Sequence, residues 1–214
     1  MGNKLNTPAN VAGRQRVAQL ILGISLVPMV ALITQNAYIL VNSRIRLDRA
    51  KAVKQRILHN IQVGTVVHDI QLERGISALY ISSKRTEDMF HKLTDIRGKL
   101  DNDLEKVIAW DWTLSLDPAE MNVTGVDFSS RTKFLEGIEE FRRTLDSTNL
   151  TIIRVLGFYS GVNEKLMDWM VVGILTSSSE NLWAALVSFH MLIVAKEQAG
   201  VERALGGTFF TDGE

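Results

Sequence analysis

The chain has 214 residues, of which 46% are hydrophobic and 22% charged, with 3 Pro and no Cys. This composition excludes a disulfide scaffold, a thiolate zinc site and a largely disordered chain. Basic and acidic residues number 24 each, so the chain lacks the overall positive field that binds nucleic acid.

Charge is unevenly distributed along the chain. Residues 1–46 carry five basic side chains and no acidic one, so this part has a net charge of +5 and the remainder −5. The five are Lys4, Arg14, Arg16, Arg44 and Arg46. Residues 17–41 contain no charged side chain and would extend roughly 37 Å as a helix, enough to cross a hydrocarbon core of about 30 Å.

We therefore predict a short cytoplasmic N-terminus over residues 1–16 and an uncleaved transmembrane signal anchor over residues 17–41. A cleaved signal peptide is the first alternative, but the stretch is long and lacks a clear small-x-small cleavage site. A buried core helix is the second, but the polar residues do not form a continuous stripe.

Two signals for the orientation of the span disagree. Basic residues are more numerous after the span than before it, which by the positive-inside rule puts the C-terminal part in the cytoplasm. Two N-glycosylation sequons begin at Asn122 and Asn149, and these are used only if that part is extracellular or lumenal. The residues alone leave the orientation open.

Downstream of the span, apolar residues recur at steps of three and four. This period predicts helices over residues 44–83, 87–109, 131–145, 150–175 and 180–205. Asp117-Pro118 and Gly125 indicate a loop over residues 111–130, and Ser177 with Glu180 indicates a capping box. No stretch alternates with a period of two for long, so we expect an all-α fold in which a helical bundle follows the transmembrane helix.

Motifs of known catalytic sites do not occur in the sequence. It contains no H-E-x-x-H, no G-x-S-x-G and no glycine-rich phosphate loop, and its histidines are scattered. We expect no catalytic residue, no metal site and no cofactor in this chain.

Two arginines break the local pattern, each preceded by a glutamate and neighboured by small residues. They are Arg74 in residues 71–80 and Arg203 in residues 196–210. A guanidinium that faces a bundle core beside small residues leaves room for an anion. The alternative is that a carboxylate from a partner helix neutralises each arginine, which would indicate a membrane-anchored dimerisation or interaction module.

Three stretches resemble the nitrate- and nitrite-sensing (NIT) domain of bacterial chemoreceptors, sensor kinases and antiterminators, and of some animal receptor guanylate cyclases. They are HDIQLERGISALYISS, FRRTLDSTNLTIIRVLGFYSGVNEKLMDWM and LVSFHMLIVAKEQAGVERALGGTFF. The resemblance covers about residues 60 to 213 and implies an all-helical sensor of two stacked four-helix arrangements. It implies that arginines on facing helices bind nitrate or nitrite.

By motif, Arg74 and Arg203 match two of these arginines, and either Arg142 or Arg143 matches the third. Which of the last two faces inward stays open, as does a sensor of another small anion. The resemblance also implies that the sensor, residues 42–214, lies outside the cell and that the sequons are used. We expect the chain to be the N-terminal part of a longer homodimeric receptor, either a guanylate cyclase or a histidine kinase or chemoreceptor.

Overall fold

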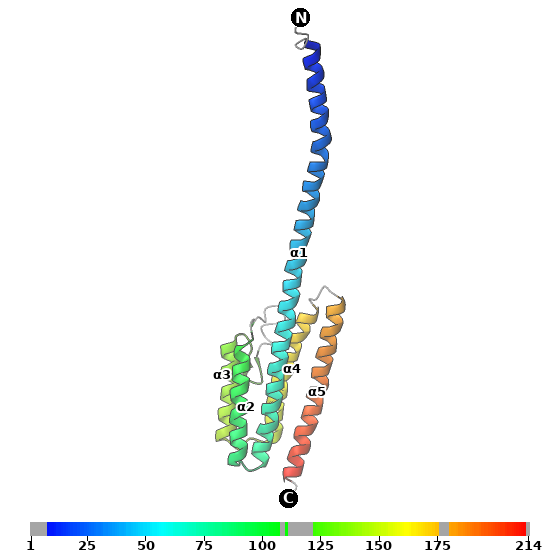
Figure 1. Ribbon diagram of the computed structural model, residues 1–214. Coiled ribbons are helices and arrows are strands. Elements are labelled where there is room, and N and C mark those ends of the chain that lie inside the picture. The colour runs from blue at the N-terminus through cyan, green and yellow to red at the C-terminus, as the bar shows by residue number, and fades with distance from the viewer. Residues whose placement is uncertain (1–7, 108–109, 111–121, 176–179, 213–214) are drawn as a thin grey trace. The chain divides into compact units, whose positions relative to one another are not determined.

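The computed structural model describes residues 8–107, 110, 122–175 and 180–212. The expected Asp117-Pro118 turn and the capping residue Ser177 lie outside these residues. The described helices are α1 (Pro8–Ser82), α2 (Glu87–Glu105), α3 (Arg131–Ser147), α4 (Ile152–Leu175) and α5 (Glu180–Asp212), as Figure 1 shows. The all-α prediction is confirmed.

One short hairpin lies in the region predicted as a loop. Strands β1 (Asn122–Val123) and β2 (Val126–Asp127) pair in antiparallel fashion. Thr124 and Gly125 connect them, with φ angles of 56° and 90°. Left-handed angles at both central residues are what a tight hairpin turn requires. The signal at Gly125 was therefore correct, whereas the two-residue strands were too short to predict.

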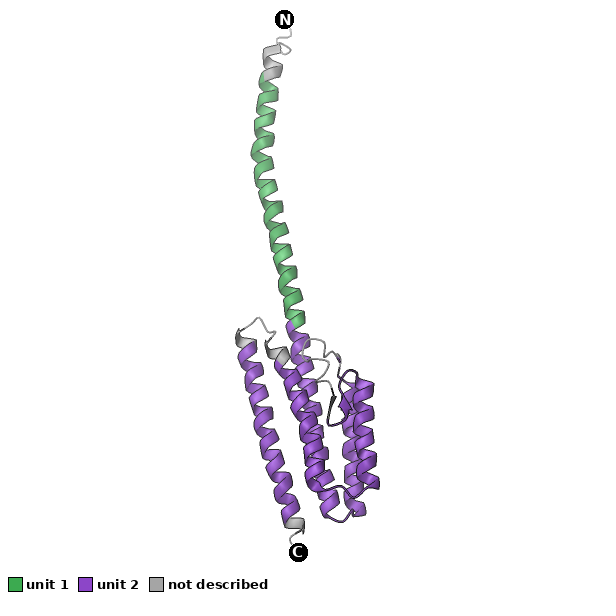
Figure 2. Ribbon diagram, turned by 180° about the vertical axis from the view of Figure 1, so that it is seen from behind, with its two compact units in different colours: residues 1–52 green, residues 53–214 purple. Residues whose placement is uncertain are grey.

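The chain divides into two compact units, residues 1–52 and 53–214 (Figure 2). Helix α1, which is 75 residues long and contains Pro28, contributes residues to both units. In the first unit every described side chain from residue 13 to residue 41 is exposed, including large apolar ones such as Leu22 and Ile24. Among the described helices, only α1 is long and apolar enough to be a candidate membrane span.

The core of the second unit joins the C-terminal part of α1 to α2, α3 and α4. Fully buried apolar side chains recur three or four residues apart on these helices, because each presents one apolar face inward. They include Ile70, Leu100, Leu104, Phe134, Ile138, Leu145, Val162 and Leu166.

Helix α5 packs beside α1 and α4 in the same unit. Its Ile193 belongs to the core cluster. At Gly64 of α1 an added Cβ atom would lie 3.0 Å from a ring carbon of Phe189 on α5, so the two helices approach closely there. This packing brings the middle of α5 against the part of α1 that carries Arg74.

Candidate functional site

Glu73 and Arg74 are adjacent on α1, and both are buried, with relative exposures of 0% and 1%. Consecutive side chains on a helix point in different directions. Glu73 accordingly faces α3 and α4, whereas Arg74 faces α4 and α5. Each belongs to a different polar network.

Arg142 of α3 forms the centre of the first network. Its Nε and Nη2 donate to the two carboxylate oxygens of Glu73 at 2.8 Å each, and its Nη1 donates to Asp101 at 2.8 Å. Burial lowers the pKa of Arg142, but the hydrogen bonds and charges of Glu73 and Asp101 outweigh it and raise the pKa overall. All three nitrogens of this guanidinium therefore have carboxylate partners.

Glu73 is held from other directions as well. The Tyr159 hydroxyl donates to it at 2.8 Å, and the Nε of Arg97 lies 3.7 Å away. Burial and the charge of Glu73 raise the pKa of Tyr159 well above its ordinary value. This network is closed: it stabilises the packing of the four helices and leaves Arg142 no unpaired nitrogen.

Arg143, the neighbour of Arg142, lies on the exposed face of α3. Its side chain is 71% exposed and pairs with Glu140 of the same helix at 2.8 Å. Between the two arginines that share a sequence motif, Arg142 is the inward one.

Arg74 forms the second network and is only partly satisfied. Its Nη1 donates to Ser160 at 2.8 Å and to the carboxylate of Glu197 on α5. Its Nε and Nη2 are buried and have no hydrogen-bond partner among the residues that the structure describes. Buried donors are nearly always paired in native proteins, so the free edge of this guanidinium is a candidate contact for a ligand.

A cavity of about 310 Å³ lies between α1 and α5 beside this edge. Its lining comprises His68, Gln71, Leu72, Gly75, Ile76, Leu79, Lys196, Gly200, Arg203, Ala204 and Gly207. A Cβ atom at Gly200 would lie 2.9 Å from the Nη2 of Arg74. The missing side chain at Gly200 thus brings the cavity wall up against the unpaired nitrogen.

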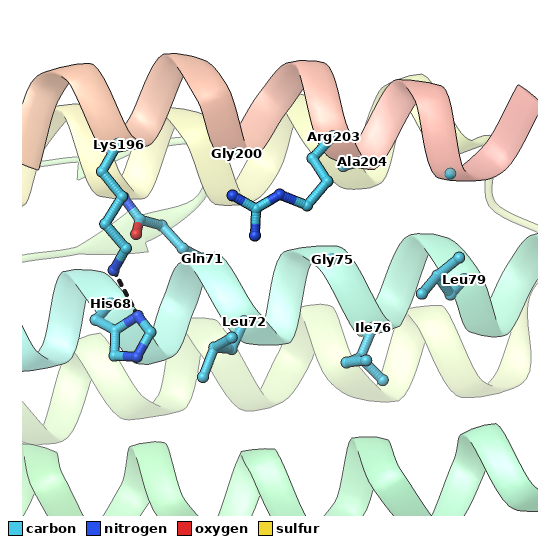
Figure 3. Close-up of a pocket in the computed structure, with 11 residues that line it drawn as sticks. His68, Gln71, Leu72, Gly75, Ile76, Leu79, Lys196, Gly200, Arg203 and Ala204 are labelled. Atoms are coloured by element: carbon cyan, nitrogen blue, oxygen red, sulfur yellow. Dashed lines mark hydrogen bonds between the residues drawn. The ribbon is translucent and has the colours of Figure 1, made fainter.

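Arg203 projects from α5 toward α1 at this cavity, as Figure 3 shows. No ion pair of Arg203 occurs among the residues that the structure describes. The two arginines that the sequence singled out therefore lie on facing helices near the same cavity: Arg203 is exposed in its lining, and the buried Arg74 lies against Gly200 of that lining.

Lys196 and His68 add a second basic group to the lining. The Lys196 Nζ lies 2.6 Å from the His68 Nδ1 (Figure 3). Burial, followed by the charge of Lys196, lowers the pKa of His68, and burial also lowers the pKa of Lys196. We infer that His68 is neutral at pH 7 and that its Nδ1 accepts a hydrogen bond from the Lys196 ammonium group.

The predicted site residues thus fall into three places. Arg203 lines the cavity and Arg74 lies against Gly200 of the same lining, whereas Arg142 lies in the closed network and Arg143 lies on the surface. The predicted glycosylation residue Asn149 is exposed between α3 and α4, whereas Asn122 begins β1.

The sequence did not predict the polar partners in these networks, among them Glu73, Glu197, His68 and Lys196. Local sequence offers little signal for the carboxylates, because an acidic residue next to a basic one on a helix resembles an ordinary solvated surface.

A family model described as nitrate and nitrite sensing matches residues 65–214. The match contains α2 to α5 and the part of α1 that carries Glu73 and Arg74. No curated protein and no solved structure matches the chain.

Proposed function

Because the chain belongs to the nitrate- and nitrite-sensing family, we propose that nitrate or nitrite binds in the cavity between α1 and α5. In this proposal the anion contacts the free edge of Arg74 and the guanidinium of Arg203. Lys196 contributes positive charge from the cavity wall.

The observation that carries the proposal is the buried, unpaired pair of nitrogens on Arg74. Nitrate is planar and offers acceptor oxygens in one plane, which suits the planar fork of a guanidinium better than the point charge of a lysine. Arg203, without an ion pair in the described residues, supplies the charge that an anion would balance.

The size of the cavity fits a small anion that keeps some water. A water molecule takes about 30 Å³ in the liquid, so about 310 Å³ holds a four-atom anion together with several waters. Residues 47–214 carry a net charge of −5 and do not concentrate anions by their overall field. We therefore expect modest affinity that depends on the local cavity.

The alternative in which carboxylates neutralise the arginines accounts for Arg142 and for one nitrogen of Arg74. It leaves the other two buried nitrogens of Arg74 without a partner among the described residues, whereas the exposed Arg203 is solvated and decides nothing between the two alternatives. We therefore assign Arg142 to helix packing and leave Arg143 outside the ligand site.

For the whole receptor we propose a cytoplasmic N-terminus over residues 1–16, a membrane span over 17–41 and an extracellular sensor over 42–214, with an output module inside the cell. The exposed sequon at Asn149 supports the extracellular placement. Expression in animal cells should give a chain whose mass falls after deglycosylation, with part of that shift lost in Asn149→Gln. An unglycosylated chain would contradict this orientation.

We propose that the receptor acts as a homodimer. Support comes from exposed apolar side chains on α5, including Met191, Leu192, Leu205 and Phe209, since such exposed groups often mark protein interfaces. Light scattering of the full chain in detergent should give twice the protomer mass. A monomeric mass at micromolar concentration would contradict the proposal.

Helix α1 carries both the candidate span and Arg74. We propose that the anion draws Arg203 and Arg74 together, shifts α5 against α1 and thereby alters the helix that enters the membrane. Cysteine crosslinking between α1 and α5 should change its rate on addition of nitrate; an unchanged rate would contradict this step.

The binding proposal is tested by calorimetric titration of potassium nitrate into the full chain in detergent micelles. We expect heat with the natural sequence and its loss in Arg74→Ala and in Arg203→Ala, with circular dichroism confirming that both variants are folded. Binding that survives in both folded variants would exclude this cavity, and competition by nitrite, chloride and acetate would give the selectivity.

A further inference from the structure

Glu197 pairs with Arg74 next to the proposed ligand site, and the inference drawn from it rests on the proposed function. The side chain is buried on α5, with a relative exposure of 4% for the residue. One carboxylate oxygen accepts from the Nη1 of Arg74. The other accepts from Gln71 at 2.8 Å and from Asn163 at 3.2 Å.

Three helices therefore hold this carboxylate in place. Gln71 and Arg74 come from α1, Asn163 comes from α4, and Glu197 itself comes from α5. Gln71 also lines the cavity, so the bonds that fix Glu197 reach the wall at which a ligand would bind. A carboxylate fixed in this way cannot rotate out of the site without leaving several buried donors unpaired.

We propose that Glu197 is a built-in anion that sets the affinity of the nitrate site. A carboxylate and nitrate both present planar oxygen acceptors to a guanidinium. Glu197 takes the Nη1 side of Arg74 and leaves the Nε and Nη2 edge for the ligand. Its negative charge lies beside the incoming anion and repels it, because like charges in a buried site are weakly screened.

Glu197 thus has two opposed effects. It supplies the counter-charge that a buried arginine needs in the unliganded protein. It also lowers the affinity of the site for nitrate, so that the site empties when nitrate becomes scarce. Such a residue sets the concentration range of a sensor without contributing a favourable contact to the ligand.

The test is calorimetric titration of potassium nitrate into the full chain carrying Glu197→Gln, at constant ionic strength. Glutamine keeps the shape and the acceptor oxygen but removes the charge. We expect nitrate affinity to rise at least about tenfold, which corresponds to about 1.4 kcal/mol.

Glu202→Gln is the matched control. Glu202 is an exposed glutamate on the same helix, so its substitution removes the same charge away from Arg74. We expect the nitrate affinity of Glu202→Gln to stay within about twofold of that of the natural sequence, since exposed charges are screened by solvent. An equal gain in both variants would overturn the specific role of Glu197.

A folded Glu197→Gln variant that binds nitrate no more tightly than the natural sequence would also overturn the inference. If the natural sequence itself bound no nitrate, the proposed function would fail instead, which keeps the two failures distinct. If Glu197→Gln does not fold, Glu197→Asp is titrated in its place. The shorter aspartate keeps the negative charge but moves it away from Arg74. A gain in affinity is expected there too, and its absence would contradict the inference.

Discussion

The two sides of α1 at Glu73 and Arg74 each carry a buried arginine paired with a glutamate, but the two arginines differ in how many of their nitrogens are paired. On the α3 side, Arg142 places all three nitrogens on carboxylates. On the α5 side, Arg74 places one nitrogen on a carboxylate, and its other two have no hydrogen-bond partner among the described residues and lie next to Gly200 of the cavity lining. A buried arginine that is fully paired stabilises helix packing, whereas a partly paired one next to open space can bind an anion.

The largest effect in this comparison should be on stability, from Arg142→Ala. Among the described residues, removing this guanidinium leaves the buried charge of Glu73 with Tyr159 and the more distant Arg97. Breaking a buried ion pair from one side costs about 3–5 kcal/mol. Urea unfolding monitored by circular dichroism measures the change in the free energy of unfolding.

Arg143→Ala is the control for this prediction, because it removes the adjacent arginine from the surface. Arg143→Ala should change the free energy of unfolding by no more than about 0.5 kcal/mol. A loss of similar size in the two variants would contradict the assignment of Arg142 to a closed network.

Arg203→Ala should show the reverse behaviour. The side chain lies at the cavity and makes no ion pair among the described residues, so its removal should change stability by no more than about 0.5 kcal/mol. Loss of a charge-assisted hydrogen bond of about 1.5–3 kcal/mol should weaken nitrate binding by about 10- to 100-fold. Arg154→Ala, which removes an exposed arginine on α4, should leave the Kd unchanged; equal weakening would indicate a general charge effect.

Gly200→Ala should narrow the access to Arg74. The new methyl group would lie 2.9 Å from the Nη2 that we assign to the ligand. We expect weaker nitrate binding by about tenfold, as for a lost hydrogen bond of about 1–1.5 kcal/mol. Gly206→Ala is the matched control, because a Cβ atom there meets nothing within 4 Å, and it should keep the nitrate Kd. Unchanged binding in Gly200→Ala would place the ligand away from this edge.

A smaller effect should follow from pH. The pKa of His68 is lowered, first by burial and then by Lys196, with Asp69 opposing and Lys99 adding to the shift. Protonation below pH 6.5 adds a positive charge to the cavity that Lys196 and Arg203 also line. Nitrate affinity should therefore rise by about two- to fivefold between pH 7 and pH 5.5. His68→Gln should flatten this profile in a calorimetric pH series, and an undiminished profile would assign it to another group.

Stability should change with pH in the opposite direction. His59 and His190 also have pKa values lowered by burial, so the folded state binds fewer protons than the unfolded state. The stabilisation from keeping these rings neutral is present above pH 6.5 and is lost as the pH falls below it. A lower pH should thus decrease the free energy of unfolding while it increases the affinity for nitrate.

The helices were predictable because apolar periodicity is a local property of the sequence. The predicted span over residues 17–41 and the predicted helix over residues 44–83 form one helix, since α1 runs without interruption from Pro8 to Ser82. The last helix extends to Asp212 rather than to residue 205, because its glycines do not end it.

The candidate site was predictable only in part. The inward direction of Arg142 could have been inferred, because it lies four residues after Ile138 and three before Leu145, both buried. The partners Glu73 and Glu197 could not, since pairing across 69 and 123 residues depends on how the helices pack. The partly satisfied state of Arg74 is likewise a property of packing rather than of sequence.

The most direct test of the central claim compares two conservative changes, Arg74→Lys and Arg142→Lys, by nitrate titration at a temperature where both variants are folded. Lysine keeps the charge but loses the planar fork. We expect Arg74→Lys to lose measurable nitrate binding, whereas Arg142→Lys should be less stable but bind nitrate with a Kd within about threefold of the natural sequence. Retained binding in Arg74→Lys together with lost binding in Arg142→Lys would contradict it.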